Sequence, residues 1–172
     1  MPIRRSLLQI ALLAAFLSAL VSGQRYNFKF YGEEEGLQSL AVQVVLQDRA
    51  GFLWVGTQNG LFRYDGNRFV GFGKAEGLPD AHIESLHESI DGTLWVGTRF
   101  GLAQRTKERF ERVDTGAPDG IVGRQGIGSD GAGVLYVATN HGLVRGTPSP
   151  KGFHFERVSD GIATSVSYRL RG

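Results

Sequence analysis

Hydrophobic and polar residues recur along this chain with a period of 41 positions. The clearest repeated segment occurs three times, as GFLWVGT at 51–57, as GTLWVGT at 92–98 and, more weakly, as GVLYVAT at 133–139. Each copy is followed, after two further residues, by Gly-Leu. Repetition at a fixed spacing indicates an array of similar units that bury their apolar faces against one another.

One repeat unit divides into four short stretches of alternating or β-branched residues, bounded by Gly, Asn and Asp. In the first unit these stretches predict strands at 41–47, 52–57, 61–65 and 68–72. Asn59-Gly60 is a hairpin signal, and we expect positive φ at both of these residues. No sustained helical period follows residue 23. Four strands in about 41 residues, with a periodic tryptophan, match the size of one β-propeller blade.

The fold class predicted from this pattern is all-β, with propeller blades of four antiparallel strands in an incomplete ring. The predicted segments are a leader at 1–23, a closing strand at 24–34, blades at 35–75, 76–116 and 117–161, and the start of a fourth blade at 162–172. Residues 27–32 lie 41 positions before a fourth strand, so they are predicted to be an orphan fourth strand that completes a last blade. Because propellers contain about four to eight blades, we expect the chain to be the N-terminal part of a longer protein.

Residues 1–23 are predicted to be a secretory signal peptide. Arg4 and Arg5 precede an apolar run from Leu7 to Val21, and small residues follow at Ser22-Gly23. The run is short for a membrane span, which needs about 20 apolar residues. An uncleaved N-terminal anchor is the alternative, and either interpretation places the rest of the chain across a membrane.

Charge and cysteine content narrow the function classes. The formal net charge is +2, but without Arg4 and Arg5 the basic and acidic side chains balance at 17 each. No stripe of Lys and Arg is present to follow a phosphate backbone, so nucleic acid is not an expected partner. The chain has no cysteine, which excludes disulfides, thiolate metal sites and cysteine nucleophiles.

The repeat resembles the two-component regulator propeller family. That family's pattern is an aspartate, a turn glycine, Leu-Trp-x-Gly-Thr, Gly-Leu and an aromatic-rich strand. The first unit matches it at Asp48, Gly51, Leu53, Trp54, Gly56, Thr57, Gly60, Leu61, Tyr64, Asp65 and Phe69. The second unit departs by Ser89 in place of the aspartate, and the third by Tyr136 and Ala138. The resemblance covers essentially all of residues 26–172.

The resemblance implies a periplasmic or otherwise extracytoplasmic sensor, exported by its leader and anchored in the inner membrane in its full-length form. The implied partners are an unknown small molecule or glycan, the remaining blades, and downstream signalling domains such as a histidine kinase or a diguanylate cyclase. A second copy of the chain, in a homodimer, is a further partner left open by the sequence. The expected function is ligand sensing without catalysis in this chain. A propeller enzyme acting on polysaccharide and a protein-interaction scaffold are the alternatives.

We expect different roles for positions that are repeated in every unit and for positions that vary between units. Residues that recur in every unit are expected to be structural, and these are Trp54, Trp95, Tyr136, Gly56 and Gly97. Binding residues are expected where the repeats differ, in turns and blade-joining loops that emerge at the same end of the strands. The candidate ligand-binding residues are Gln58, Asn59, Arg99, Phe100, Asn140, His141, Glu76 and Asp80.

No catalytic residue, cofactor or metal site is predicted. The histidines at 82, 87, 141 and 154 have no metal-ligand spacing with one another or with acids, and are interpreted as surface or loop residues. No serine lies in a Gly-x-Ser-x-Gly nucleophile elbow. Glycosidic cleavage would need two carboxyl groups that face each other across a sugar, and their separation cannot be inferred from sequence.

Overall fold

A computed structural model of the chain describes residues 27–116, 122–150 and 152–158. The predicted leader at 1–23 and the predicted start of a fourth blade at 162–172 lie outside the described residues. The chain divides into two units, and the first contributes only the described residues 27–30, which form no regular element. All strands belong to the second unit, which begins at Tyr31. Within the described ranges, no helix has the length and apolar character needed to cross a membrane.

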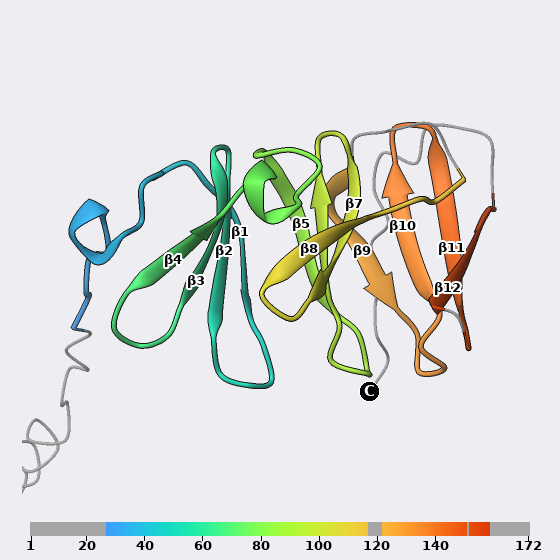
Figure 1. Ribbon diagram of the computed structural model, residues 1–172, viewed down its shortest axis with the longest axis horizontal. Coiled ribbons are helices and arrows are strands. Elements are labelled where there is room, and N and C mark those ends of the chain that lie inside the picture. Colours follow the sequence, from blue (N-terminus) through green and yellow to red (C-terminus); the bar gives the residue numbers. More distant parts are fainter. Residues whose placement is uncertain (1–26, 117–121, 151, 159–172) are drawn as a thin grey trace, which may run out of the picture. The chain divides into compact units, whose positions relative to one another are not determined.

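Three four-stranded antiparallel sheets make up the second unit (Figure 1). The first sheet contains β1 (Val42–Gln47), β2 (Leu53–Thr57), β3 (Gly60–Tyr64) and β4 (Phe69–Phe72). The second contains β5 (Ile83–Glu88), β6 (Leu94–Thr98), β7 (Gly101–Thr106) and β8 (Arg109–Val113). The third contains β9 (Val122–Ser129), β10 (Leu135–Thr139), β11 (Gly142–Ser149) and β12 (Gly152–Arg157). The predicted all-β class with four-stranded blades is confirmed, and the described residues do not close a ring.

Each sheet pairs its strands in chain order, because short turns join consecutive strands as hairpins. The strands of the first sheet begin and end within one residue of the predicted ranges. The predicted strand at 27–32 is different, since none of its residues forms a strand. A three-residue 3-10 turn, η1 (Glu33–Glu35), follows it instead. The assignment of residues 24–34 to a missing blade stays a prediction, as do the blade boundaries.

A second 3-10 turn, η2 (Lys74–Glu76), lies 41 residues after η1 and has the same capping arrangement. The Glu76 carboxylate accepts a hydrogen bond from the Gly73 N–H at 2.7 Å, as Glu35 does from the Gly32 N–H at 2.9 Å. These backbone donors would otherwise be unsatisfied at the start of each turn. The two turns therefore give the segments that lead into β1 and β5 the same backbone shape.

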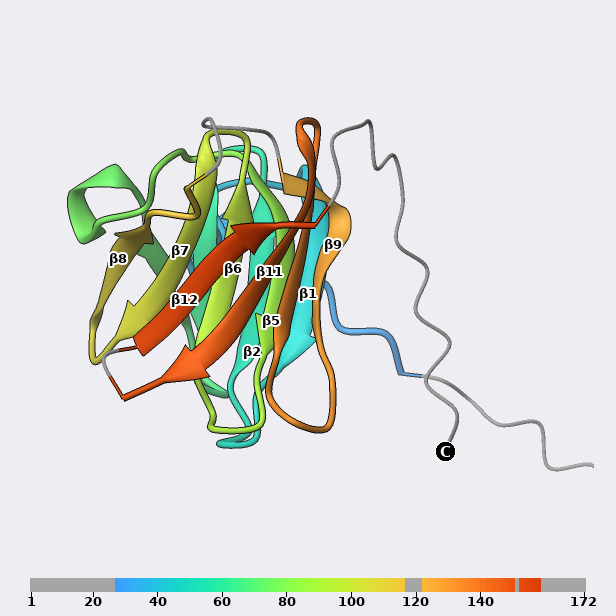
Figure 2. The same ribbon diagram turned by 90° about the vertical axis from the view of Figure 1, so that its right-hand side faces the viewer.

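The first strands of the three sheets, β1, β5 and β9, lie side by side, whereas the fourth strands lie away from them (Figure 2). In a propeller, blades of this kind surround a central channel. We call β1, β5 and β9 the inner strands, because the first strand of each blade is the one that faces such a channel.

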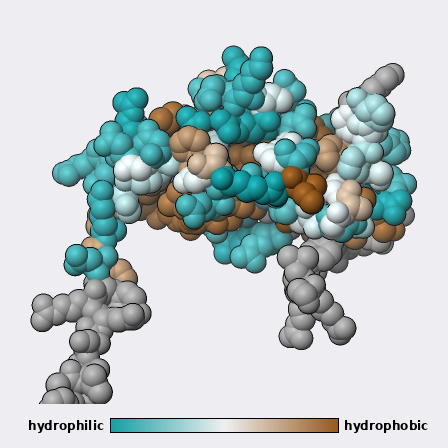
Figure 3. Space-filling view, turned by 90° about the horizontal axis from the view of Figure 1, so that it is seen from below, coloured by the Kyte–Doolittle hydropathy of each residue, from teal (hydrophilic) through white to brown (hydrophobic). Residues whose placement is uncertain are grey.

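The core lies between the sheets. Trp54, Leu61 and Phe72 of the first sheet belong to one buried cluster with residues of the second sheet, including Val96 and Phe110. A second buried cluster joins the second sheet to the third and contains Trp95, Leu102, Val122, Ile127, Leu135, Val137 and Val144. Hydrophobic residues also reach the surface between the hydrophilic loops, as the space-filling view shows (Figure 3). The fold is thus held by contacts between successive sheets, as expected for stacked repeats.

Candidate functional site

The turns β2–β3, β6–β7 and β10–β11 share one construction. Thr57 Oγ1 donates to the Gly60 carbonyl at 2.9 Å and accepts from the Asn59 N–H at 3.0 Å. Thr98 and Thr139 make the same two hydrogen bonds in their own sheets. Among non-glycine residues described, positive φ occurs only at positions 107 and 125, so the expectation of positive φ at Asn59 is wrong. Gly60 alone adopts it, with φ 134°, because the threonine hydroxyl closes the turn.

Six of the eight predicted ligand-binding residues are the central pairs of these turns, which are Gln58-Asn59, Arg99-Phe100 and Asn140-His141. We call the end of the sheets that carries these three turns the turn end. All six residues are exposed except His141, which is half-buried. The blade-joining connection lies at the same end, since the Gly60 N–H donates to the Ala81 carbonyl at 2.8 Å. Whether these residues bind a ligand stays a prediction.

The other two predicted residues, Glu76 and Asp80, have structural partners. Glu76 caps η2, as described above. Asp80 accepts from the His82 N–H at 3.0 Å and pairs with Lys74 Nζ at 3.1 Å. Burial raises the pKa of Asp80, but the hydrogen bond from His82 and the Lys74 charge lower it by more, so its pKa lies below the ordinary value. Both carboxylates fix the connection that leads into β5.

The residues predicted to be structural lie inside the sheets. Trp54 and Trp95 are completely buried, whereas Tyr136 is half-buried. Each aromatic residue bonds to the residue six positions earlier. The donor–acceptor distances are 2.7 Å from Trp54 Nε1 to Asp48 Oδ2, 3.0 Å from Trp95 Nε1 to Ser89 Oγ, and 3.4 Å from Tyr136 Oη to Asp130 Oδ2. The serine that departs from the family pattern therefore keeps the aspartate's role.

Sequence reasoning missed a feature of the inner strands. Each inner strand contains a β-bulge near the turn end, where residues face no partner on the neighbouring strand. In β1 the extra residue is Gln43, and in β5 it is Glu84, one repeat later in the chain. In β9 the bulge is larger, because residues 123–126 face the single residue Ala138. Bulges redirect side chains and are common beside functional sites.

The three bulges bring polar side chains from three blades together. Arg124 Nη2 donates to Gln43 Oε1 at 2.7 Å, across 81 positions of sequence. Arg124 Nε lies 3.6 Å from Glu84 Oε2. His82 Nε2 lies 3.2 Å from Glu84 Oε1. We call these four residues the inner-strand cluster, and it is the candidate functional site.

Burial differs sharply within the inner-strand cluster. The side chains of Glu84 and His82 are 11% and 15% exposed, so the interpretation of His82 as a surface residue is wrong for its side chain. The side chain of Arg124 is 73% exposed. A buried carboxylate is costly unless it is paired, and here each of its oxygens faces a nitrogen. The cluster therefore contains one exposed guanidinium, that of Arg124, which is paired with the buried carboxylate of Glu84.

The sequence contains a signal for this site. Between two aliphatic residues of the inner strand, the second unit has Glu84-Ser85 and the third has Gly-Arg-Gln-Gly at 123–126, an insertion of two residues. Charged residues inside otherwise apolar strands, at a place where the repeat changes length, are unusual for a purely structural position. The alignment of turns alone did not reveal it.

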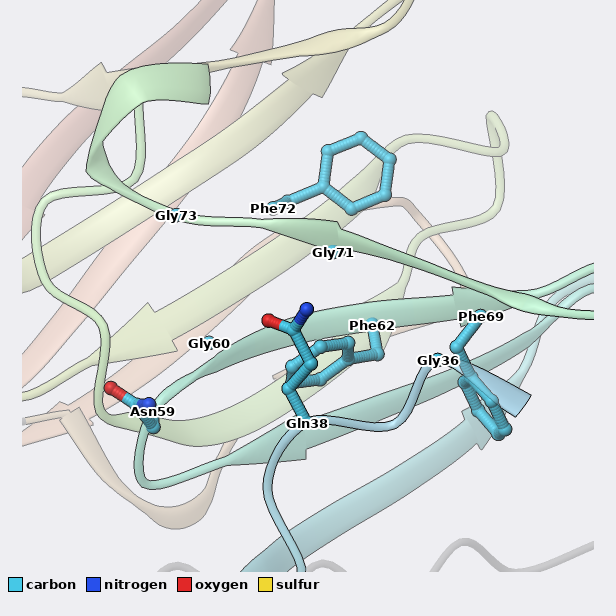
Figure 4. A pocket seen from close by; sticks show the side chains of 9 residues that line it. All are labelled: Gly36, Gln38, Asn59, Gly60, Phe62, Phe69, Gly71, Phe72 and Gly73. Carbon is cyan, nitrogen blue, oxygen red and sulfur yellow. The ribbon is translucent and has the colours of Figure 1, made fainter. Parts of the chain in front are cut away.

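A cleft of about 400 Å³ lies beside the predicted residue Asn59 (Figure 4). Gln38 and Asn59 supply polar groups, and Phe62 and Phe69 are among its apolar lining. It opens on the face of the first sheet that is not packed against β5. The equivalent face of the second sheet is buried against the first. The cleft is therefore an uncovered space of the kind that lies between blades, and we do not assign it a ligand.

Comparison with known proteins agrees with this architecture. The family described as "Two component regulator propeller" matches residues 36–59 and 77–100. Histidine kinase P4 of Formosa agariphila is 38% identical over 60 residues, which span 34% of this chain and 4% of that protein. The chain therefore covers a small part of this curated relative's length.

Several solved structures share the fold. The extracellular domain of the hybrid two-component system BT3049 from B. thetaiotaomicron aligns with a TM-score of 0.58 and 23% identity, over 67% of this chain and 17% of that one. The extracellular domain of BT4673 from the same organism gives a TM-score of 0.63 and 21% identity, over 81% and 18%. Virginiamycin B lyase from Staphylococcus aureus gives 0.56 and 12%, over 81% and 47%.

These likenesses to solved structures show the fold, which occurs both in extracellular domains of two-component systems and in a lyase. The family is indicated by the matched repeats, since residues 36–59 and 77–100 contain the Leu-Trp-x-Gly-Thr segment of the first two sheets up to its β2–β3 or β6–β7 turn. Two repeats of this chain therefore match the two-component regulator propeller family, and the third sheet repeats their strand arrangement.

Proposed function

We propose that this chain is the extracytoplasmic, ligand-sensing propeller region of a signalling receptor with a histidine kinase or diguanylate cyclase output. Its ligand is a small molecule or glycan that binds at the turn end, above the inner strands. The likeness to extracellular domains of two-component systems supports this location, as does the predicted leader. The matched segment spans 4% of Histidine kinase P4 and this chain covers 17% of the extracellular domain of BT3049, so relatives of this length leave room for further blades and, in the kinase, an output domain.

The observation that carries the proposal is the inner-strand cluster. Polar side chains from three blades meet there, so a ligand bound to them would contact β1, β5 and β9 at once. A ligand shifts the equilibrium between two arrangements of the blades only if it binds one arrangement more tightly than the other. A site shared by three blades provides those contacts.

The same cluster favours binding over catalysis. Its single carboxylate, Glu84, faces His82 with one oxygen and Arg124 with the other. A glycosidase would need a second carboxyl group across the sugar, and the described cluster contains none. A polysaccharide-cleaving propeller therefore remains the second candidate, without a structural feature that favours it.

The test is a binding screen of the full-length protein against plant and bacterial oligosaccharides and their monomers, by calorimetry. For a ligand found there, Glu84→Gln should weaken binding about tenfold or more, because the charge that holds Arg124 is lost. Glu111→Gln is the matched control, since Glu111 is exposed on β8, far along the sheet from the inner strands. If both variants bind the ligand with equal affinity, the ligand does not bind at the inner-strand cluster.

The two alternatives give different results in the same experiment. A propeller enzyme would release shorter products from the oligosaccharides, which chromatography detects. A protein-interaction scaffold would bind none of them and would instead retain a protein partner in a pull-down from the periplasm. Either result would replace the sensor proposal.

A further inference from the structure

We propose that Arg124 anchors an oxyanion on the ligand, so that the sensor selects ligands with a carboxylate, sulfate or phosphate group. This inference rests on the proposed function, since it names the ligand class of the same site. It is drawn from the position of one guanidinium among its neighbours.

Arg124 is displayed by the two-residue insertion in β9, which has no counterpart in β1 or β5. Its side chain is 73% exposed, although its Nε faces buried Glu84 and its Nη2 is hydrogen-bonded to Gln43. Among the described residues, its Nη1 forms no hydrogen bond or ion pair. The two contacts hold the guanidinium through Nε and Nη2, and the 73% exposure of the side chain leaves its Nη1 side open to solvent.

The other groups of the cluster argue against a cationic ligand. Both oxygens of Glu84 already face nitrogens, so this carboxylate has little capacity to accept from a ligand. On the connection leading into β5, Asp80 pairs with Lys74 and Glu76 caps Gly73. Arg99 adds a second exposed cation at the same end. The charge that an incoming ligand meets first at the cluster is therefore positive.

The chemistry of the open edge specifies the ligand group. A guanidinium edge presents two parallel N–H donors, which match two oxygens of a carboxylate, sulfate or phosphate. Pre-orientation by Glu84 and Gln43 reduces the side-chain entropy that binding would otherwise cost. Neutral hydroxyl groups could still contribute hydrogen bonds, but they would not use both donors with the same strength.

The experiment measures the reaction of phenylglyoxal with individual arginines of the full-length protein, by peptide mass spectrometry. Sodium acetate, sulfate and phosphate are compared with chloride at equal ionic strength. We expect one or more of these anions to slow the modification of Arg124 about fivefold, with saturation in the millimolar range. Protection by acetate identifies a carboxylate site, and protection by sulfate or phosphate a site for tetrahedral oxyanions.

Arg68 is the control, because it is an exposed arginine in the turn between β3 and β4, away from the turn end. Equal protection of Arg68 and Arg124, or no saturable protection of Arg124, overturns the inference. Thermal melting gives a second readout, in which the anion-dependent rise should vanish in Arg124→Gln and persist in Arg68→Gln. If a ligand of the screen binds Arg124→Gln as tightly as the parent, the oxyanion anchor fails while the sensor function stands. If anions protect Arg124 but the screen finds no ligand, the oxyanion anchor stands while the sensor function fails.

Discussion

At the scale of single residues, Trp54 and Trp95 combine two requirements of the repeat. Each indole is completely buried between sheets, and each ring nitrogen has a hydrogen-bond acceptor six residues earlier. A buried N–H without such a partner would be costly. Trp54 also contacts two aromatic rings, since its centroid lies 5.6 Å from that of Phe72 and 6.3 Å from that of Phe110. These contacts explain the aromatic residue at this position of the first unit.

Replacing Trp54 or Trp95 with alanine should therefore lower the free energy of unfolding. The expected loss is about 3–5 kcal/mol, from lost burial and the cavity that remains. Denaturant unfolding of the full-length protein measures it. Phe100→Ala is the control, because this phenylalanine is 57% exposed and should change stability by only about 0.5 kcal/mol. A tryptophan variant with unchanged melting but lost ligand binding would show that the residue recognises the ligand instead.

His87 on β5 is a second residue whose environment departs from the sequence interpretation. It is half-buried, and its Nε2 lies 2.9 Å from Ser129 Oγ on the neighbouring inner strand β9. Burial lowers its pKa from the ordinary 6.5, the Arg49 charge lowers it further, and Glu88 partly opposes them. The interpretation as a surface histidine is wrong here, because two adjacent inner strands enclose the ring.

The lowered pKa gives a pH prediction. Below about pH 6.5 the unfolded chain binds the proton more readily than the folded one, so stability should fall as pH decreases through this value and should level off above it. Chemical denaturation between about pH 5 and 8 measures the slope. His87→Gln should make the free energy of unfolding depend less on pH, because the contribution of this residue is lost. His154→Gln on β12 should leave the pH dependence unchanged. An unchanged slope in His87→Gln would contradict the assignment.

At the scale of strands and sheets, the repeat made most of the architecture predictable. Each strand of the first sheet was placed within one residue, because the same alternation and the same turn glycines occur in register in three units. The inner-strand bulges were not predictable in this way. An extra unpaired residue, such as Gln43 or Glu84, leaves the pattern of apolar residues on either side intact. The convergence of Gln43 and Arg124 depends on the packing of three sheets, which no single unit specifies.

The approach of one sheet to the next also explains the glycine of Leu-Trp-x-Gly-Thr. A Cβ at Gly97 would lie 2.5 Å from Val122 Cγ1 on β9, and one at Gly56 would lie 2.6 Å from Ile83 Cγ2 on β5. Both distances are shorter than any ordinary contact between carbon atoms. The missing side chain at this position therefore lets the aliphatic residue of the following inner strand pack against the sheet.

Gly97→Ala should therefore destabilise the protein by about 1–3 kcal/mol through overpacking. Gly131→Ala is the matched control, because its Cβ would meet nothing within 4 Å and its backbone φ is not positive. Thermal or denaturant unfolding of both variants decides the matter. Equal stability of Gly97→Ala and the parent would mean that β9 can shift away without cost, and that the sheet-to-sheet distance is not fixed by this glycine.

At the scale of the whole molecule, the two faces of the first sheet have different surroundings. Ile83 and Leu86 of β5 are 0% and 7% exposed, because they pack against the first sheet. Their equivalents one repeat earlier, Val42 and Val45, are 44% and 54% exposed. Within the described residues, no further sheet packs against that face. An apolar sheet face of this kind is normally covered by the neighbouring blade in a repeat array.

Residues 24–172 on their own should consequently self-associate or exchange their amide hydrogens rapidly, instead of forming a stable monomer. The exposed valines of β1 offer an apolar face to a second copy, and a sheet edge without a partner is a template for strand pairing. Light scattering and hydrogen exchange on the purified segment measure both effects. Val42→Lys with Val45→Lys should reduce the association, while Val70→Lys on β4, at a position 36% exposed, should not. A monodisperse monomer with slow exchange in all three sheets would show that these three blades are stable without a neighbour, and the expectation that a longer ring completes them would lose its physical basis.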